Sequence, residues 1–312
     1  MGYNLGYAQK HKTKVAHQIL RANVMTVLKT QISCFDTTWN PCVGCTKISP
    51  GCDHCYAEAI AKRFFGGFHV RTHPERLEEV RKFKPLHTVD GPLVPRRVLV
   101  NSMSDLWHSD IPDDFIDDIF DTITKHPHTI FVCLTKRVLR LRQYGERRWS
   151  NGVPDNVWLG VSVENNQTSG RIDAMRGLKE AVGNFTAYVN VEPLLGPVDR
   201  HDYFGIDWVG VGGEAGTQAR PCKKEWVRQV IAKAQVAGAA VWFKSWGRWE
   251  NNPAWSLAEG RTKKQRKDNL VDRGLELLPE EHGGATIDGA LIQELPPSFE
   301  WIGKALNATR KI

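Results

Sequence analysis

The stretch TIFVCLTKRVLRLRQYGERRWSNGVPDNVWLGVSV, residues 129–163, carries the pattern on which our fold prediction rests. It begins with the apolar run Thr129–Leu134, continues through a helix-like segment at Val138–Tyr144, and ends in a second β-branched and aromatic run at Val157–Val163. Short strand-like runs that alternate with amphipathic helices are typical of βα units around a parallel sheet. The stretch therefore predicts one strand–helix–strand unit of an α/β fold.

The same alternation extends outward in both directions along the chain. We expect five further strands at Ile32–Thr38, Arg97–Ser102, Ala187–Val191, Ile206–Val211 and Ala240–Phe243. Four further helices are expected at Tyr56–Phe65, Asp113–Lys125, Ser169–Ala181 and Glu225–Ala237. This number of units predicts a parallel, partial TIM-type β/α barrel over residues 29–250, with an N-terminal basic arm at 1–28 and a C-terminal extension at 251–312.

Composition and charge narrow the class of protein. The 312 residues are 41% hydrophobic and 25% charged, which is typical of a globular chain. No apolar run approaches the roughly 18 residues that span a bilayer, and no secretory signal is visible, so we expect a cytoplasmic protein and no membrane partner. The net charge of +7 is concentrated at Lys10–Arg21, Arg137–Arg148 and Arg261–Lys267. Nucleic acid is the anionic partner that such runs favour, although solvated helix faces produce the same balance.

Cysteines give the most specific signal. Four of the seven fall between Cys42 and Cys55, in the segment TWNPCVGCTKISPGCDHCY at residues 38–56, directly after the first expected strand. In a chain without an export signal this crowding predicts metal or redox chemistry rather than disulfides. Cys34 and Cys133 lie in apolar runs and are expected to be inert core thiols.

Two kinds of site remain open from the cysteine spacing alone. A [4Fe–4S] cluster is held by cysteine thiolates, and an enzyme that uses S-adenosylmethionine (SAM) at the cluster supplies only three of them, which leaves one iron for SAM. Alternatively, the pairs Cys42-x2-Cys45 and Cys52-x2-Cys55 suit a structural zinc ion. A closed four-cysteine electron-transfer cluster is a third reading, which would leave the polar groups described next without a reaction.

The expected strands end in polar or glycine-rich tails. In a parallel α/β barrel the carboxyl ends of the strands form the active face, so these tails predict one shared pocket, although helix caps and turns would use the same residue types. The tails are Asn101–Asp105, Thr135–Arg137, Ser162–Asn165, Asn190–Pro193, Gly212–Glu214 and Lys244–Trp246.

Together with the cysteine segment, five later stretches resemble the phage-type three-cysteine radical SAM proteins over residues 33–250. The resemblance implies a [4Fe–4S] cluster on Cys45, Cys52 and Cys55, no requirement for Cys42, SAM as cofactor and an external electron donor. It departs from the usual radical SAM spacing, which has three and two residues between the cysteines, whereas this chain has six and two. The stretches are Leu134–Arg137, Trp158–Glu164, Val191–Pro197, Gly210–Glu214 and Trp242–Gly247.

The resemblance also suggests residues for the cofactor and the substrate. Gly212-Gly213-Glu214 is similar to the element that holds the SAM ammonium, although that element usually follows the second strand, where this chain has Asn101-Ser102. We therefore expect Asn101, Ser102, Glu164, Gly212, Gly213 and Glu214 at the cofactor. At the barrel mouth we expect Lys136, Glu192 and Lys244 as catalytic groups, with Trp39, Trp107, Trp246 and Trp249 as candidates for stacking on adenine or on a base.

The predicted function is reductive cleavage of SAM to start radical chemistry on a second substrate. Resemblance and the basic runs suggest a modified base in DNA, with isomerisation of a glycine-modified thymidine as the nearest reaction, and a duplex base would have to be extruded first. The alternatives are a zinc-stabilised nucleic-acid-binding module and a radical SAM enzyme that acts on a peptide or small metabolite.

Overall fold

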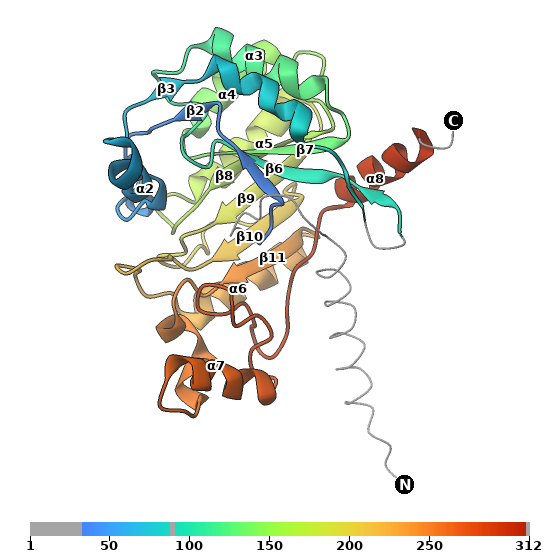
Figure 1. Ribbon diagram of the computed structural model, residues 1–312. Coiled ribbons are helices and arrows are strands. Elements are labelled where there is room, and N and C mark those ends of the chain that lie inside the picture. The colour runs from blue at the N-terminus through green and yellow to red at the C-terminus, as the bar shows by residue number, and fades with distance from the viewer. Residues whose placement is uncertain (1–32, 88–90, 310–312) are drawn as a thin grey trace.

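A curled sheet of seven parallel strands forms the centre of the molecule (Figure 1). The computed structural model describes residues 33–87 and 91–309. The strand order is β1-β6-β7-β8-β9-β10-β11, with β1 and β11 at the two edges, so the sheet is a half-barrel of the predicted α/β type. The strands are β1 Thr37–Trp39, β6 Arg96–Val100, β7 Thr129–Thr135, β8 Val157–Ser162, β9 Thr186–Val191, β10 Trp208–Gly212 and β11 Ala240–Ser245.

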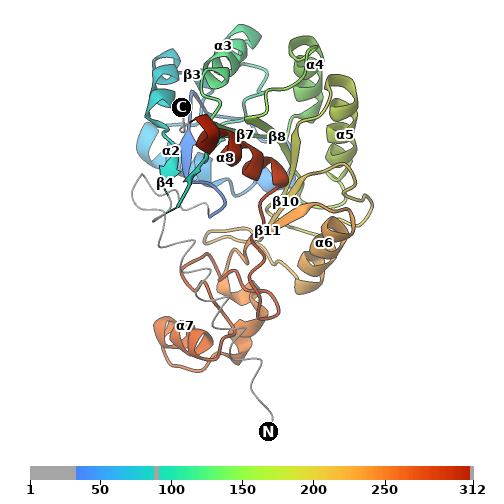
Figure 2. The same ribbon diagram turned by 90° about the vertical axis from the view of Figure 1, so that its right-hand side faces the viewer.

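Helices cover the convex face of this sheet (Figure 2). In α3 the buried residues Phe115, Ile119 and Ile123 recur every four positions, and acidic residues after Pro112 favour the helix start as predicted. All five predicted helices are present, and the largest difference is that α4 runs four residues beyond Tyr144. They are α2 Tyr56–Phe65, α3 Asp113–Thr124, α4 Val138–Arg148, α5 Gly170–Val182 and α6 Lys224–Val236.

The strands are apolar on both faces. In β7, Phe131 and Cys133 pack in the core beneath the helices, while Ile130 and Val132 pack in a second core inside the half-barrel. Tyr188 stacks on Trp208 in this inner core, with ring centres 4.4 Å apart. Strands that are buried on both sides read as continuous apolar runs, which is why six of the seven strands were visible in the sequence. The first strand was expected at Ile32–Thr38, but β1 shares only Thr37 and Thr38 with that range, and residues 33–36 are not part of a strand.

The C-terminal extension is partly built into the half-barrel. Residues 292–294 run beside the edge strand β11, where the Phe243 amide donates to the Ile292 carbonyl and the Glu294 amide to the Val241 carbonyl, each at 2.8 Å. Helix α8, Pro297–Thr309, follows and places Ile302 in the inner core. The extension thus covers an edge that would otherwise be free to pair. The N-terminal arm at 1–28 lies outside the described residues.

Several short elements were not predicted. Two antiparallel pairs join β2 Cys42–Val43 to β3 Arg71–Thr72, and β4 Leu86–His87 to β5 Leu93–Val94. Helix α7, Lys263–Asp272, starts with a capping box between Thr262 and Gln265. Short 3-10 helices are η1 Pro50–Cys52, η2 Pro74–Lys82, η3 Trp249–Asn251 and η4 Pro253–Leu257. Within the described part of the chain, no helix has the length and apolar character to cross a membrane.

The basic run on α4 is largely balanced by its neighbour α3. Arg140 pairs with Asp113 at 2.8 Å, Arg147 with Asp117 at 3.3 Å, and Arg148 with Asp121. Because these arginines already have acidic partners, this part of the +7 charge does not form a free anion-binding surface. Of the other two basic runs, Arg261–Lys267 extends into the first half of α7, and Lys10–Arg21 lies outside the described residues.

Candidate functional site

A cavity of about 670 Å³ opens at the carboxyl ends of the strands. All six predicted strand tails contribute to its lining, so the structure brings them to one site as the barrel topology requires. Its volume lies in the range of small-molecule and cofactor pockets. The lining side chains that carry the argument below are Cys45, Cys52, Cys55, Asn101, Ser102, Lys136, Glu192, Glu214 and Lys244.

The structure separates the four clustered cysteines into three and one. Cys45, Cys52 and Cys55 all line the cavity. Cys42 is 0% exposed and packs in the core beneath the helices, and its amide donates to Asn101 Oδ1 at 3.1 Å. Burial raises the pKa of the Cys42 thiol to about 12. Cys34 and Cys133 are buried as expected, although Cys34 borders the cavity.

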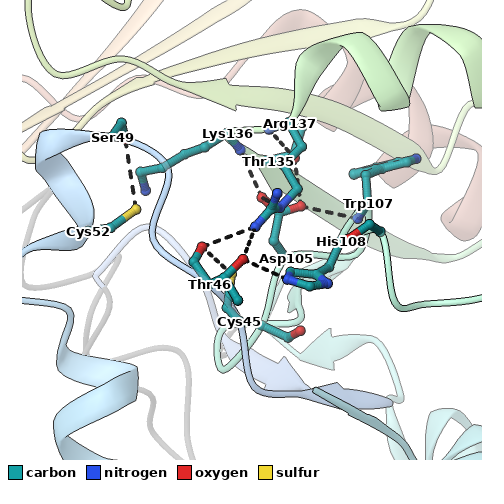
Figure 3. Close-up of polar contacts among 12 residues, drawn as sticks. Cys45, Thr46, Ser49, Cys52, Asp105, Trp107, His108, Thr135, Lys136 and Arg137 are labelled. Atoms are coloured by element: carbon teal, nitrogen blue, oxygen red, sulfur yellow. Dashed lines mark hydrogen bonds and ion pairs between the residues drawn. The ribbon is translucent and has the colours of Figure 1, made fainter. Parts of the chain in front are cut away.

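The loop that carries the three cysteines is tied to the half-barrel at three places, the first being Thr46 (Figure 3). Arg137 Nη2 donates to the Thr46 carbonyl at 3.0 Å and to Thr46 Oγ1 at 2.8 Å, and His108 Nε2 lies 2.8 Å from the same hydroxyl. Burial raises the pKa of Cys45, and Asp105 adds to this effect, while Arg137 opposes it. Arg137 therefore both holds the loop and favours a thiolate at Cys45.

Asp105 anchors the backbone that precedes Arg137, and its carboxylate lies 4.0 Å from Arg137 Nε. Its carboxylate accepts from Thr135 Oγ1 at 2.6 Å, from the Lys136 amide at 3.0 Å and from the Trp107 amide at 3.1 Å (Figure 3). These contacts join the ends of β6 and β7. As a result the Lys136 backbone is fixed, while its side chain lines the cavity.

The second tie is made by Glu164, which was expected at the cofactor. Its carboxylate is fully buried and accepts from Ser49 Oγ at 2.7 Å and from Arg171 Nη1 at 3.0 Å. The loop approaches so closely that a Cβ at Gly51 would lie 2.6 Å from Glu164 Cγ, which explains the glycine. In this structure Glu164 contacts the cysteine loop rather than the cavity.

The third tie is an ion-pair cluster around Glu214. Arg220 donates to Glu214 through Nε at 2.8 Å and Nη2 at 2.5 Å, and it reaches the loop at Asp53 Oδ2 (3.1 Å) and at the Pro50 carbonyl (2.8 Å). His54 Nδ1 lies 3.3 Å from the same carboxylate. Burial by itself raises the pKa of Glu214, but the hydrogen bonds from Arg220 and His54 outweigh it and hold this pKa below its usual value.

Glu192 and Lys244 form an ion pair across the wall of the cavity. Burial lowers the pKa of Lys244, yet the Glu192 carboxylate outweighs burial and raises it. Tyr56, the first residue of α2, also lines the cavity, and its hydroxyl donates to the Ser102 carbonyl at 2.7 Å. The predicted catalytic groups are thus together at one end of the fold.

Other predicted residues have packing roles. A Cβ at Gly213 would lie 2.2 Å from the Trp246 carbonyl oxygen, so glycine is needed there for the close approach of two loops, and Gly212 ends β10 beside Glu192. The expectation that four tryptophans stack on a ligand is wrong, because Trp39, Trp107, Trp246 and Trp249 are all buried in packing contacts and none lines the cavity. These four large apolar side chains stabilise the fold by being buried in the core.

Sequence reasoning missed the residues that hold the loop, namely Ser49, Arg171 and Arg220. Arg220 lies 167 residues from its partner Asp53, and Ser49 lies 115 residues from Glu164. No local spacing links residues so far apart. Only the polar character of the segment around them was visible in the sequence.

Comparison with protein families matches residues 29–296 to the family described as "Protein of unknown function (DUF5131)". The chain belongs to this family. No curated protein matches it. Among solved structures it is similar to a cysteine-to-serine mutant of spore photoproduct lyase, with 15% identity, a TM-score of 0.40, and 67% of this chain and 65% of that chain covered. Spore photoproduct lyase complexed with dinucleoside spore photoproduct matches with 14% identity, a TM-score of 0.37, and 62% and 59% covered. The chain spans about two thirds or less of these two proteins, and the likeness is remote.

Proposed function

We propose that this protein is a radical SAM enzyme whose [4Fe–4S] cluster is held by Cys45, Cys52 and Cys55. The observation that carries the proposal is the division of the cysteines: these three line one cavity at the carboxyl-terminal face of a parallel half-barrel, while Cys42 is buried in the core. Three thiolates leave one iron of a cubane cluster open, which is what binding of SAM requires. A closed site would need a fourth cysteine, and the two nearest candidates, Cys42 in the core and Cys34 at the cavity border, are both buried thiols.

The donor set fits a cluster better than a single zinc ion. Across residues 33–87 and 91–309, no three His, Cys, Asp or Glu side chains converge in a way that would hold one metal ion. A cubane cluster distributes its cysteines over different irons, so the three sulfurs need not converge on one point. Zinc in a structural site needs four ligands around one centre, and the buried thiol of Cys42 does not supply the fourth.

When bound, the cluster and SAM supply reductive cleavage of the sulfonium and thereby a radical that starts the reaction. The chain's own residues orient the participants. Arg137, Glu164 and Arg220 hold the cysteine loop in one conformation, so that ligand geometry does not depend on a flexible loop. We propose Asn101, Ser102, Gly213 and Glu214 as the polar wall beside SAM, since all of them line the cavity.

Lys136, Glu192 and Lys244 are the groups that we propose for the second substrate. The side chains of Lys244 and Glu192 are 18% and 19% exposed at the cavity wall, so a polar ligand that reaches them meets a partly buried charged donor beside a charged acceptor. Isomerisation of a glycine-modified thymidine remains a prediction from the sequence resemblance, as does the alternative of a peptide or small metabolite.

Anaerobic reconstitution tests this proposal. We expect the protein to bind about four irons and four sulfides, and we expect Cys45→Ala, Cys52→Ala and Cys55→Ala each to abolish the cluster. Cys42→Ala is the matched control, since it removes a thiol from the same segment and should leave the iron content unchanged. Reduction in the presence of SAM should then release 5′-deoxyadenosine. Stoichiometric zinc without iron–sulfur absorbance would contradict the proposal.

A further inference from the structure

One loop of the C-terminal extension forms part of the cavity wall. His282, on the segment 276–286, lines the cavity on the side of Lys244 and Glu192. Its side chain is exposed, and within the described part of the chain it has no hydrogen-bond or ion-pair partner. The cavity is therefore completed by a residue from outside the half-barrel, whose imidazole is available to a ligand.

A buried carboxylate holds this loop in one conformation. Glu276 is 0% exposed, and a Cβ at Gly284 would lie 2.1 Å from its Oε2 atom, so glycine is needed at that position. The carboxylate accepts six hydrogen bonds of 2.7–3.2 Å from both ends of the loop and from the segment before α7, which satisfies a charge that would otherwise be costly to bury. The donors are the amides of Leu277, Leu278, Ala285 and Thr286 and the side chains of Thr286 and Asn252.

Trp246 fastens the same loop to the end of β11, two residues after Lys244. Its amide donates to the Gly284 carbonyl at 3.0 Å, and its indole Nε1 donates to the Thr286 carbonyl at 3.0 Å. These short links fix the loop against the strand that carries Lys244. His282 is thus placed at the cavity by a built structure.

The charges near His282 act on its imidazole with unequal strength. Burial lowers the pKa of His282 from its usual value of 6.5, and the Lys244 ammonium lowers it further, while the Glu192 carboxylate raises it by a smaller amount. The other titratable groups around the Lys244–Glu192 pair are uncharged at neutral pH, and on the loop itself Glu280 and Glu281 have interactions of their own. These uncharged groups, whose pKa values are raised by burial, are Cys34, Tyr56 and Tyr188.

The groups that the protein leaves without a partner favour an anionic ligand. The three carboxylates that line the cavity, those of Asp105, Glu192 and Glu214, are all held in hydrogen bonds or ion pairs. Among the described residues, the basic side chains of the lining without such a partner are Lys136 and His282. A ligand that supplies an acceptor to these groups replaces only water, whereas a cationic ligand would have to displace an existing partner of a carboxylate.

We propose that His282 is a substrate-binding residue, and that together with Lys244 it binds an oxyanionic group, a carboxylate or a phosphate, of the second substrate. An oxyanion between the two side chains accepts a hydrogen bond from each and offsets the repulsion between an ammonium and an imidazolium ion. Glu192 competes with this anion for Lys244. Because the imidazolium binds an anion more tightly than the neutral ring does, binding takes up a proton from solvent onto His282.

This inference deepens the proposed function by naming a chemical group of its second substrate, and it rests on that function for the view that the ligand is a substrate. Iron content and release of 5′-deoxyadenosine are measured separately. The two ideas can therefore fail independently of each other.

NMR titration of the histidine rings in the full chain, purified anaerobically, tests the inference without turnover. Acetate is the carboxylate probe, and sulfate, which stays ionised throughout the titration, is the probe for a phosphate-like group. Each should raise the pKa of His282 saturably, beyond the effect of chloride at the same ionic strength, and acetate should bind roughly fivefold more tightly near pH 5.5 than near pH 8. The His282 resonance is assigned by its loss in His282→Gln.

His126 is a matched control within the same spectrum. Its pKa is also lowered by burial and by nearby cations, but it does not line the cavity. Screening of charge by any anion should therefore act on His126 as well, and His126 should respond to acetate and sulfate as it does to chloride.

Two variants of the ion pair give opposite expectations. Glu192→Gln removes the competing carboxylate and should tighten acetate binding at His282, whereas Lys244→Met removes the shared cation and should weaken it. An unchanged His126 titration shows that each variant is folded. A response to one probe alone would assign the group as a carboxylate or as phosphate-like. The inference is overturned if His282 responds to acetate and sulfate no more than to chloride, or if Lys244→Met binds acetate as tightly as the wild type.

Discussion

Replacing Arg220 by methionine should loosen the loop that carries the three cavity cysteines. The side chain of Arg220 donates to Glu214 twice and to Asp53 and the Pro50 carbonyl once each, so it connects the end of β10 to the cysteine loop. Methionine keeps much of the length of the side chain but has no donor. The carboxylate of Glu214, which is only 5% exposed, would then lose its cationic partner.

The size of the effect follows from the burial of the two groups. Removing one partner of a fully buried ion pair costs about 3–5 kcal/mol, whereas hydrogen bonds to charged groups contribute about 1.5–3 kcal/mol. The Arg220 side chain is 28% exposed, and Glu214 would keep His54 and the backbone amide of residue 220 as donors. We therefore expect Arg220→Met to destabilise the closed conformation of the loop by about 2 kcal/mol, a value from the lower part of these ranges.

Native-state hydrogen exchange measures this change at the loop itself. The Cys52 amide donates to the Ser49 carbonyl at 2.9 Å, and the Asp53 amide to the Pro50 carbonyl at 3.2 Å. If opening of the loop governs their exchange, a loss of about 2 kcal/mol accelerates it roughly 30-fold. Arg228→Met is the control, since it breaks an exposed arginine–aspartate pair with Asp288 away from the loop. Exchange of both amides at the wild-type rate in Arg220→Met would refute the reasoning.

Two further predictions concern titration. The pKa of Glu214 is held below its usual value of 4.5, so the stability that this carboxylate contributes is present above pH 4.5 and is lost as the pH falls through the lower folded pKa. The ratio of the loop amide exchange rate in Arg220→Met to the rate in the wild type should therefore decline toward one below about pH 4.5. A ratio that stays constant with pH would argue against Glu214 as the partner of Arg220. Burial raises the pKa of Cys34 and of Cys42 to about 12 and also raises the pKa of Cys45, so iodoacetamide at neutral pH should label Cys52 and Cys55 of the cluster-free protein before Cys45 and should spare Cys34 and Cys42, as peptide mass spectrometry would detect. Labelling of Cys34 as fast as Cys52 would show that its burial is not maintained.

Elements with a strong local pattern were predictable. Helix α2 was predicted with both ends correct, because Tyr56 to Phe65 lies between the cysteine segment and a glycine pair, and a left-handed residue, Gly66, ends it. Six of the seven strands were visible because each contains an apolar run with buried residues on both faces, whereas β1, Thr-Thr-Trp, has no such run and was expected several residues too early. Helix α8 and the segment at 292–294 were missed, since they are stabilised by packing on the inner core and on β11 rather than by a periodicity of their own.

The candidate site was predictable only in outline. Polar tails after parallel strands must meet at one end of a barrel, so their convergence followed from topology. The hydrogen-bond partners of those polar groups could not be predicted from the topology. Glu164 and Glu214 were both expected at the cofactor, but only Glu214 lines the cavity, and both carboxylates also engage the cysteine loop, through Ser49 and Arg220. The choice among possible partners depends on contacts between segments that are more than 100 residues apart.

By itself, the sequence determined the class of the fold, the position of the cysteine cluster after the first strand, and the end of the barrel where chemistry could occur. These properties depend on spacing and on apolar periodicity, which are local. Only the tertiary structure decided that Cys42 is a core residue while Cys45, Cys52 and Cys55 face a cavity. Their spacing is equally compatible with four ligands or with three, and burial of a thiol is settled by what the rest of the chain packs against it.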